Sequence, residues 1–181
     1  MNKTLLWITL AAACVACDPK ETAKPVIYDG PMRVGEEVEM LRSEKGVVQV
    51  KLKAKKVLEF QNGDRDFPEG LYLEFYNEFH VITSTLRANS AHYSREDDLW
   101  KGQGNVEVKN IEKKQQLNSE ELFWNPKTKK IYTDKFVTVR DQEDVIYGTG
   151  LDAAQDMSVY NIHHIEGEFA VQEDSTSGKP Q

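Results

Sequence analysis

The chain has 181 residues, of which 39% are hydrophobic, 29% charged and 9% aromatic. It is too apolar for a disordered chain and too polar for a bundle of membrane-spanning helices, so we expect one soluble globular domain. The 23 Lys and Arg against 30 Asp and Glu give a net charge of −7, which argues against a nucleic-acid-binding protein because such proteins present basic surfaces.

The N-terminal segment has the order of charges and apolar residues of a secretory signal. Lys3 precedes an apolar run of 12 residues at positions 5–16, and the polar sequence from Cys17 to Pro19 follows it. As a helix this run would extend about 18 Å, well short of the roughly 30 Å of hydrocarbon that a spanning segment must cross. We therefore expect residues 1–16 to be a cleaved signal peptide.

Small residues directly before a cysteine resemble a bacterial lipobox, in which the cysteine is diacylated and becomes the mature N-terminus. Cys17 is the predicted lipidation site because the apolar run ends there, and Cys14, after three alanines, is a competing site. A conventional signal with two ordinary cysteines is the alternative. With both cysteines in this segment, packing alone must stabilise the body. Residues 17–39, rich in Pro and Gly, are predicted to form the lipidated terminus and a tether.

The body shows the period-two pattern of β-strands. From residue 48 to 60 the even positions are apolar except Lys56, which predicts a strand with one buried face. Further strands are predicted at 71–75, 81–86, 105–108, 121–124, 130–133, 136–139, 145–147 and 159–165. A helix at 119–123 is the best competing interpretation, but Asn125-Pro126 leaves it too short to be stable. Regular short strands predict an all-β protein.

Turn formers and a repeat indicate how the strands are connected. Turns are predicted at 62–64, 67–70, 102–105, 125–126 and 148–150. A weak repeat at an offset of 31 residues places Leu86 on Leu117 and Val106 on Val137. Stacked repeats extend a core along one axis, which predicts an elongated, curved pair of sheets over residues 40–172. The polar segment 173–181 is predicted to be a disordered tail.

Several segments of the body together resemble the LptC family, the periplasmic components of the lipopolysaccharide export bridge. They are Leu-Trp-Lys-Gly-Gln-Gly-Asn-Val-Glu-Val-Lys-Asn at 99–110, Leu-Asn-Ser-Glu-Glu-Leu-Phe-Trp-Asn at 117–125, Ile-Tyr-Thr-Asp at 131–134, Val-Thr-Val at 137–139 and Gly-Thr-Gly-Leu at 148–151. Residues 70–76 and 84–91 fit the same family, so the resemblance covers roughly residues 40–168. LptA and the N-terminal domain of LptD belong to the same wider, OstA-like group. The resemblance implies an open, twisted, antiparallel β-jellyroll whose apolar groove holds lipid acyl chains.

The same resemblance implies a place in outer-membrane biogenesis. It implies that one edge of the jellyroll docks on the inner-membrane ABC transporter formed by LptB, LptF and LptG, and that the other edge docks on an LptA-like periplasmic protein. The body would then stand at the periplasmic face of the inner membrane of a Gram-negative cell, receiving lipopolysaccharide and passing it on without catalysis or cofactor. Familiar members keep an N-terminal transmembrane helix, whereas this chain is expected to carry a lipid anchor.

Alternation along the strands gives a set of candidate lipid-binding residues with inward side chains. They are Leu73, Phe75, Leu86, Val106, Leu122, Trp124, Val137 and Val139. In a compact domain the core would use all of them, whereas an incompletely closed jellyroll would leave part of this lining free for acyl chains, each buried methylene contributing about 0.8 kcal/mol. Unpaired sheet edges would additionally allow successive jellyrolls to join by β-augmentation.

Signals for catalysis or metal binding are weak. His163 and His164 are adjacent, and neighbouring side chains of a strand point to opposite faces, so we expect neither a shared metal ion nor another metal site. The same geometry separates Asp97 from Asp98, and Glu120 from Glu121, although glycoside hydrolysis needs two carboxyl groups that converge on one bond. The rival hypotheses are a periplasmic carbohydrate-active enzyme and a structural envelope lipoprotein without a groove.

Overall fold

The computed structural model describes residues 28–141 and 144–167. The predicted signal peptide, the lipidation site Cys17 and the tail at 173–181 lie outside these residues. Within them all regular structure is β, which confirms the all-β prediction. The strands are β1 (Arg33–Glu44), β2 (Val47–Glu59), β3 (Arg65–Phe67), β4 (Leu71–Tyr76), β5 (Ile82–Ala88), β6 (Ser90–Ser94), β7 (Leu99–Asn110), β8 (Gln115–Asn125), β9 (Lys130–Asp141), β10 (Asp144–Ala154) and β11 (Tyr160–Glu166).

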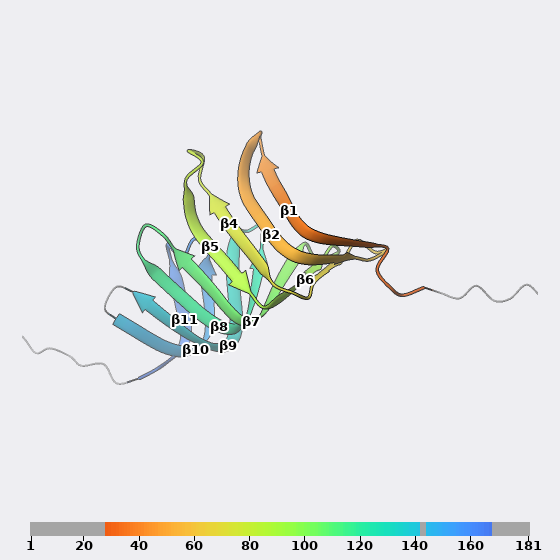
Figure 1. The fold of residues 1–181 in the computed structure, drawn as a ribbon. Helices are drawn as coiled ribbons and strands as arrows, with labels where there is room; N and C mark the ends of the chain where they lie inside the picture. Colours follow the sequence, from red (N-terminus) through yellow and green to blue (C-terminus); the bar gives the residue numbers. More distant parts are fainter. Residues whose placement is uncertain (1–27, 142–143, 168–181) are drawn as a thin grey trace, which may run out of the picture.

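All eleven strands belong to one antiparallel sheet in the order β11-β10-β9-β8-β7-β5-β4-β2-β3-β6, with β1 added to β2 and a further pairing of β6 with β7. The long strands are bent, so each contributes to two facing layers (Figure 1). The first layer contains β4, β5 and the strand halves that continue from them; the second contains β3, β6 and the other halves. This is the elongated β-jellyroll that the sequence predicts.

The bends coincide with residues of positive φ. In β7 the register shifts between Gln103 and Val106, where Gly104 and Asn105 have φ of 73° and 46°. In β10 the shift lies between Thr149 and Leu151, around Gly150 with φ of 78°. The prediction of turns at 102–105 and 148–150 is therefore wrong. A positive φ suits a β-bulge as well as a hairpin turn, and here it bends a continuous strand from one layer into the other.

The hydrophobic core lies between the two layers. Strand β2 shows how the alternation changes at a bend: Leu52 and Ala54 are buried as predicted, but the next buried residue is Val57, and Leu58 is only half-buried. The predicted apolar face at even positions thus holds only up to Ala54. Beyond it the strand passes into the second layer, where the other set of side chains faces the core.

The 31-residue repeat has a direct structural meaning. Leu86 on β5, Val108 on β7 and Leu117 on β8 are direct cross-strand neighbours, so Leu86 and its repeat partner Leu117 lie two strands apart at the same depth. Val106 and Val137 are likewise joined through Ser119. One repeat therefore corresponds to a step of two strands along the sheet, which restores the strand direction.

The structure places three strands where no strand was predicted. Strand β1 begins at Arg33, so residues 33–39 belong to the sheet although their composition suggests a tether. Most side chains of β1 are exposed because it forms an edge, and such a strand has no continuous apolar face to reveal it in the sequence. Strands β3 and β6 are short, with three and five residues, which hides their periodicity.

Candidate functional site: an apolar cavity between the layers

An apolar cavity of about 410 Å³ lies between the two layers at the β1–β2 end of the molecule. The first layer contributes residues from β1, β2 and β4, and the second contributes residues from β3, β6, β7 and β8. The lining residues are Met40, Leu41, Arg42, Ser43, Val50, Leu52, Arg65, Leu73, Tyr93, Asp98, Trp100 and Trp124. Such a cavity suits a hydrocarbon chain, because burial of apolar surface is favourable without directional contacts.

Cross-strand register sets which side chains meet in this cavity. In the first layer Met40 pairs with Leu52, and Leu52 with Leu73, which forms one apolar row. In the second layer Tyr93 pairs with Trp100 and Trp100 with Trp124, which forms a row of aromatic residues. Residues directly opposite in an antiparallel pair project from the same face, so both rows face the space between the layers.

The aromatic side of the cavity is a connected cluster. The ring centroids of Tyr93 and Trp100 are 4.7 Å apart, and those of Trp100 and Trp124 are 5.8 Å apart. Phe75 meets Trp124 edge to face at 5.2 Å, and Phe67 lies 5.3 Å from Trp100. Contacts of this kind fix ring orientations. The cluster gives the cavity one firm wall, whereas the facing wall includes the exposed edge strand β1.

Charged groups stand at the mouth of the cavity. Arg65 lies over the Tyr93 ring, with its guanidinium carbon 5.7 Å from the ring centroid. The Tyr93 hydroxyl donates to Asp98 Oδ1 at 3.1 Å, and Lys127 Nζ lies 3.7 Å from Asp98 Oδ2. Burial and this hydrogen bond raise the pKa of Tyr93 above its ordinary value. Asp98 is therefore already occupied by two partners of this chain.

Next to the cavity, the connection between β10 and β11 closes the space between the layers. Residues 155–159 join β10 to β11 at the second layer, where Ala153 pairs with Tyr160, and reach over to the first layer. There Ser84 Oγ donates to Gln155 O at 3.1 Å and Asn110 Nδ2 donates to Asp156 O at 2.6 Å. Trp124 Nε1 donates to Gln155 Oε1 at 3.0 Å, and Met157 is fully buried beneath the crossing. The connection joins the two layers beside the cavity, because Trp124 belongs both to the cavity lining and to this contact.

All eight residues predicted to bind lipid have buried side chains that face the space between the layers, none more than 4% exposed. Only Leu73 and Trp124 line the cavity itself. The other six pack in the core around and beyond it. Sequence reasoning missed the cavity residues Met40 and Arg65 because both lie on strands that were not predicted. Tyr93 stands 31 residues before Trp124, the offset of the repeat, and this spacing was the available signal for the aromatic wall.

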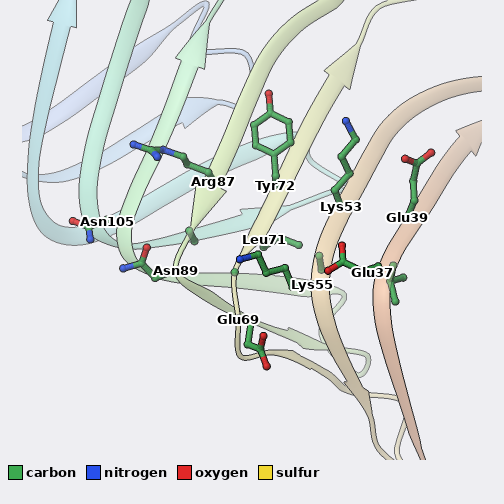
Figure 2. A pocket seen from close by; sticks show the side chains of 14 residues that line it. Glu37, Glu39, Lys53, Lys55, Glu69, Leu71, Tyr72, Arg87, Asn89 and Asn105 are labelled. Atoms are coloured by element: carbon green, nitrogen blue, oxygen red, sulfur yellow. The ribbon is translucent and has the colours of Figure 1, made fainter.

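A larger hollow of about 680 Å³ lies on the outer face, where β1, β2, β4 and β5 bend (Figure 2). Glu39, Lys53, Tyr72 and Arg87 rise to the same side from these four strands (Figure 2). Most of its charges are paired with neighbours on the same face, as in Lys51–Glu39 at 2.8 Å, Lys53–Glu74 at 3.4 Å and Arg87–Glu107 at 2.9 Å. Charged side chains surround this hollow and it is open to water, so it suits a hydrocarbon chain less well than the cavity between the layers.

The candidate catalytic pairs do not converge. Asp97 accepts a hydrogen bond from Ser94, whereas Asp98 accepts one from Tyr93. Glu121 lies 2.8 Å from Lys101, while Glu120 is exposed. His163 pairs with Asp152 at 2.7 Å. Within residues 28–141 and 144–167 no group of three His, Cys, Asp or Glu side chains has the geometry of a metal site.

Both ends of the sheet present an edge strand. Among residues 28–141 and 144–167, β1 pairs only with β2 and β11 only with β10, so each has one side whose backbone groups face away from the sheet. The two strands lie at opposite ends of the molecule (Figure 1). In the part of the chain that the structure describes, no helix is long and apolar enough to cross a membrane.

Comparison with known proteins identifies the family. Residues 4–165 match the family described as "Lipopolysaccharide-assembly, LptC-related". No curated protein matches the chain significantly. The family match spans well over half of the chain. The members of this family are components of lipopolysaccharide transport, and it is not a known enzyme family. The chain therefore belongs to the LptC-related family of lipopolysaccharide-assembly proteins.

Proposed function

We propose that this protein carries lipopolysaccharide by holding acyl chains in the cavity between the two layers, and that it catalyses no reaction. The cavity of about 410 Å³, lined by two rows of apolar side chains, is the observation that supports this function best. Its volume lies within the roughly 300–1,000 Å³ of ordinary ligand sites, and each methylene group that it buries contributes about 0.8 kcal/mol.

The eight predicted lipid-binding residues take different parts in this proposal. Leu73 and Trp124 contact the acyl chain in the cavity directly. Leu86, Val106, Leu122, Val137 and Val139, with Phe75 beside Trp124, meet lipid only as the layers separate beyond the cavity. The crossing at 155–159 joins the layers beside the cavity, so lipid that advances through the jellyroll has to loosen its hydrogen bonds to Ser84 and Asn110.

The two edges provide the docking surfaces of the proposal. Strand β1 is nearer in sequence to the predicted anchor at Cys17, so its edge faces the inner-membrane ABC transporter LptB/LptF/LptG. The cavity lies at this same end, where lipid would enter. The edge of β11 faces an LptA-like periplasmic protein, and strand addition at both edges would join the grooves into one path.

The anchor at the periplasmic face of the inner membrane is part of the proposal. Residues 1–16 are removed as a lipoprotein signal peptide, and Cys17 becomes the acylated N-terminus. Mass spectrometry of the membrane-extracted protein should show an acylated Cys17. The variant Cys17→Ala should lose acylation while Cys14→Ala keeps it, and a mature chain that still begins at Met1 would contradict this anchor.

Photo-crosslinking in cells tests lipid binding. Met40 lines the cavity and is only partly buried, so a benzoylphenylalanine at this position can replace it without opening the core. We expect a lipopolysaccharide adduct that forms only while the transporter hydrolyses ATP. The matched control is the same group at Tyr132, an exposed aromatic position on the outer face of β9, which should give none. If a folded Met40 variant never captures lipopolysaccharide, the structural-lipoprotein hypothesis replaces this one.

A further inference from the structure

Two arginine residues line the apolar cavity, one from each layer. Arg42 lies on β1 directly opposite the inward-facing Val50, so it projects toward the space between the layers. Arg65 lies on β3 opposite Tyr93, at the end of the aromatic row. Both line the cavity. The cavity thus combines an apolar interior with guanidinium groups from both walls.

Neither guanidinium is neutralised by this chain. Among the described residues, no carboxylate lies within 4 Å of Arg42 or Arg65 in an ion pair, whereas most lysines of the strands are paired, as Lys51 is with Glu39. The acidic residue of the cavity, Asp98, is held by Tyr93 and Lys127. The charge that the mouth presents to a ligand is therefore positive, on a chain whose net charge is −7.

Arg65 lies against the aromatic row of the cavity. Its guanidinium carbon lies 5.7 Å from the centroid of the Tyr93 ring, and Tyr93 is itself held by Asp98 and by its contact with Trp100. Stacking on an aromatic ring leaves the N–H groups at the guanidinium edge directed outward. These groups match the oxygen atoms of a phosphate in a bidentate arrangement.

We propose that Arg42 and Arg65 bind the phosphorylated headgroup of the lipid whose acyl chain occupies the cavity, so that the site selects anionic over uncharged amphiphiles. This inference rests on the proposed function and adds the headgroup chemistry to it. The guanidinium groups and the apolar rows line the same cavity, so one amphiphile can contact both. An uncharged lipid would leave two cations at the mouth without a partner.

The alternative is that both arginines only cover apolar surface with their aliphatic stems and keep their charged ends in water. That alternative predicts no dependence on the ligand's charge. A double-mutant-type cycle, in which the arginines and the lipid phosphates are removed separately and together, distinguishes the two hypotheses. Recognition of phosphate appears only when both the arginines and the phosphate are present.

The test uses the full chain with benzoylphenylalanine at Met40, reconstituted in liposomes with lipopolysaccharide or with the same lipopolysaccharide after enzymatic removal of its phosphates. With both arginines present, we expect the phosphorylated lipid to give at least about fivefold more adduct than the dephosphorylated lipid. In the double variant Arg42→Gln, Arg65→Gln this preference should disappear. The control double variant Arg33→Gln, Arg140→Gln removes two exposed positive charges that do not line the cavity and should keep the preference.

Each outcome has a distinct meaning. Equal capture of both lipids by the parent protein, or a preference that survives in the double Gln variant, overturns the headgroup inference but leaves acyl-chain binding standing. No adduct with either lipid in folded protein overturns the proposed function and this inference together. A millimolar excess of inorganic phosphate should reduce capture only slightly; if it removes the adduct as completely as the double variant does, the site binds free phosphate and the headgroup assignment is wrong.

Discussion

The two ends of this jellyroll use the same strand geometry but differ in how their layers meet. At the β1–β2 end, the rows of Leu52 and Trp100 face each other across a cavity of about 410 Å³. At the β8–β11 end, the corresponding row of Leu117 and Val139 is fully buried, and residues 155–159 join the layers. An inward-facing apolar residue therefore borders a cavity at one end and belongs to a closed core at the other.

The difference between the two ends arises from the segments that pack beside each row of side chains. The β1–β2 end is completed by an edge strand whose side chains are mostly exposed, so no apolar side chain fills the last space. The β8–β11 end has a connection between β10 and β11 that inserts Met157 and supplies polar partners to Asn110. Substitutions that shorten a side chain, enlarge it or remove its hydrogen bonds should therefore affect stability differently at the two ends.

Truncation of a core residue should give the largest contrast in stability. Leu117→Ala removes buried atoms from the closed end, and we expect the free energy of unfolding to fall by about 2–5 kcal/mol. Met40→Ala at the open end should cost less than about 1 kcal/mol, because the side chain is only partly buried and borders a cavity. Urea unfolding followed by circular dichroism measures both. Equal losses would mean that the two ends are packed alike.

Enlargement of a side chain should reverse the contrast. Val108→Phe adds volume to the closed core, and we expect a loss of about 1–3 kcal/mol from overpacking. Leu52→Phe directs the added volume into the cavity, so stability should stay near that of the parent while crosslinking of lipopolysaccharide from position 40 falls sharply. A Leu52→Phe protein that is as stable as the parent and still captures lipid normally would show that acyl chains bind elsewhere.

Loss of the hydrogen bonds that join the two layers should have a smaller and more local effect on stability. Asn110→Ala removes the donor to Asp156 O and the acceptor for Lys113 N, which should cost about 1–3 kcal/mol and speed hydrogen exchange at residues 155–158. The matched control is Gln116→Ala, whose amide bonds only to Asn118 two residues away. If exchange at 155–158 is unchanged in Asn110→Ala, other contacts hold the crossing closed.

The response to pH should be the smallest effect and should differ between sites. Burial alone would raise the pKa of Glu107, but the hydrogen bond and charge of Lys109 and the charge of Arg87 outweigh it and lower the pKa below 4.5. Its contribution to stability is therefore present above pH 4.5 and lost as the pH falls through the lowered value. At the cavity, the raised pKa of Tyr93 gives a contribution that is present below pH 10 and lost as the pH rises further.

Urea unfolding across pH separates these two contributions. Glu107→Gln should flatten the acid side of the stability profile, and Tyr93→Phe should flatten the alkaline side. Glu107→Gln should leave the alkaline side unchanged, and Tyr93→Phe should leave the acid side unchanged. An acid profile that Glu107→Gln leaves unchanged would show that other carboxylates dominate acid unfolding.

The sequence by itself determined the all-β class and the inward faces. Period-two alternation is a local property, so the buried sides of Leu73 and Val139 could be predicted residue by residue. The resemblance of the body segments to the LptC family was sufficient to predict the family. The repeat at an offset of 31 residues was also visible in the sequence. It arises because every second strand of the sheet returns to the same depth.

Only the tertiary structure decided which inward residues border a cavity and which fill a core. Leu73 and Val139 have the same chemistry and the same alternation, but they differ in what lies across the space between the layers. That opposite surface comes from strands distant in sequence, including β1 and β3, which lack a strong pattern of their own. The glycines at 104 and 150 likewise permit either a turn or a bulge, and the pairing of whole strands selects the bulge.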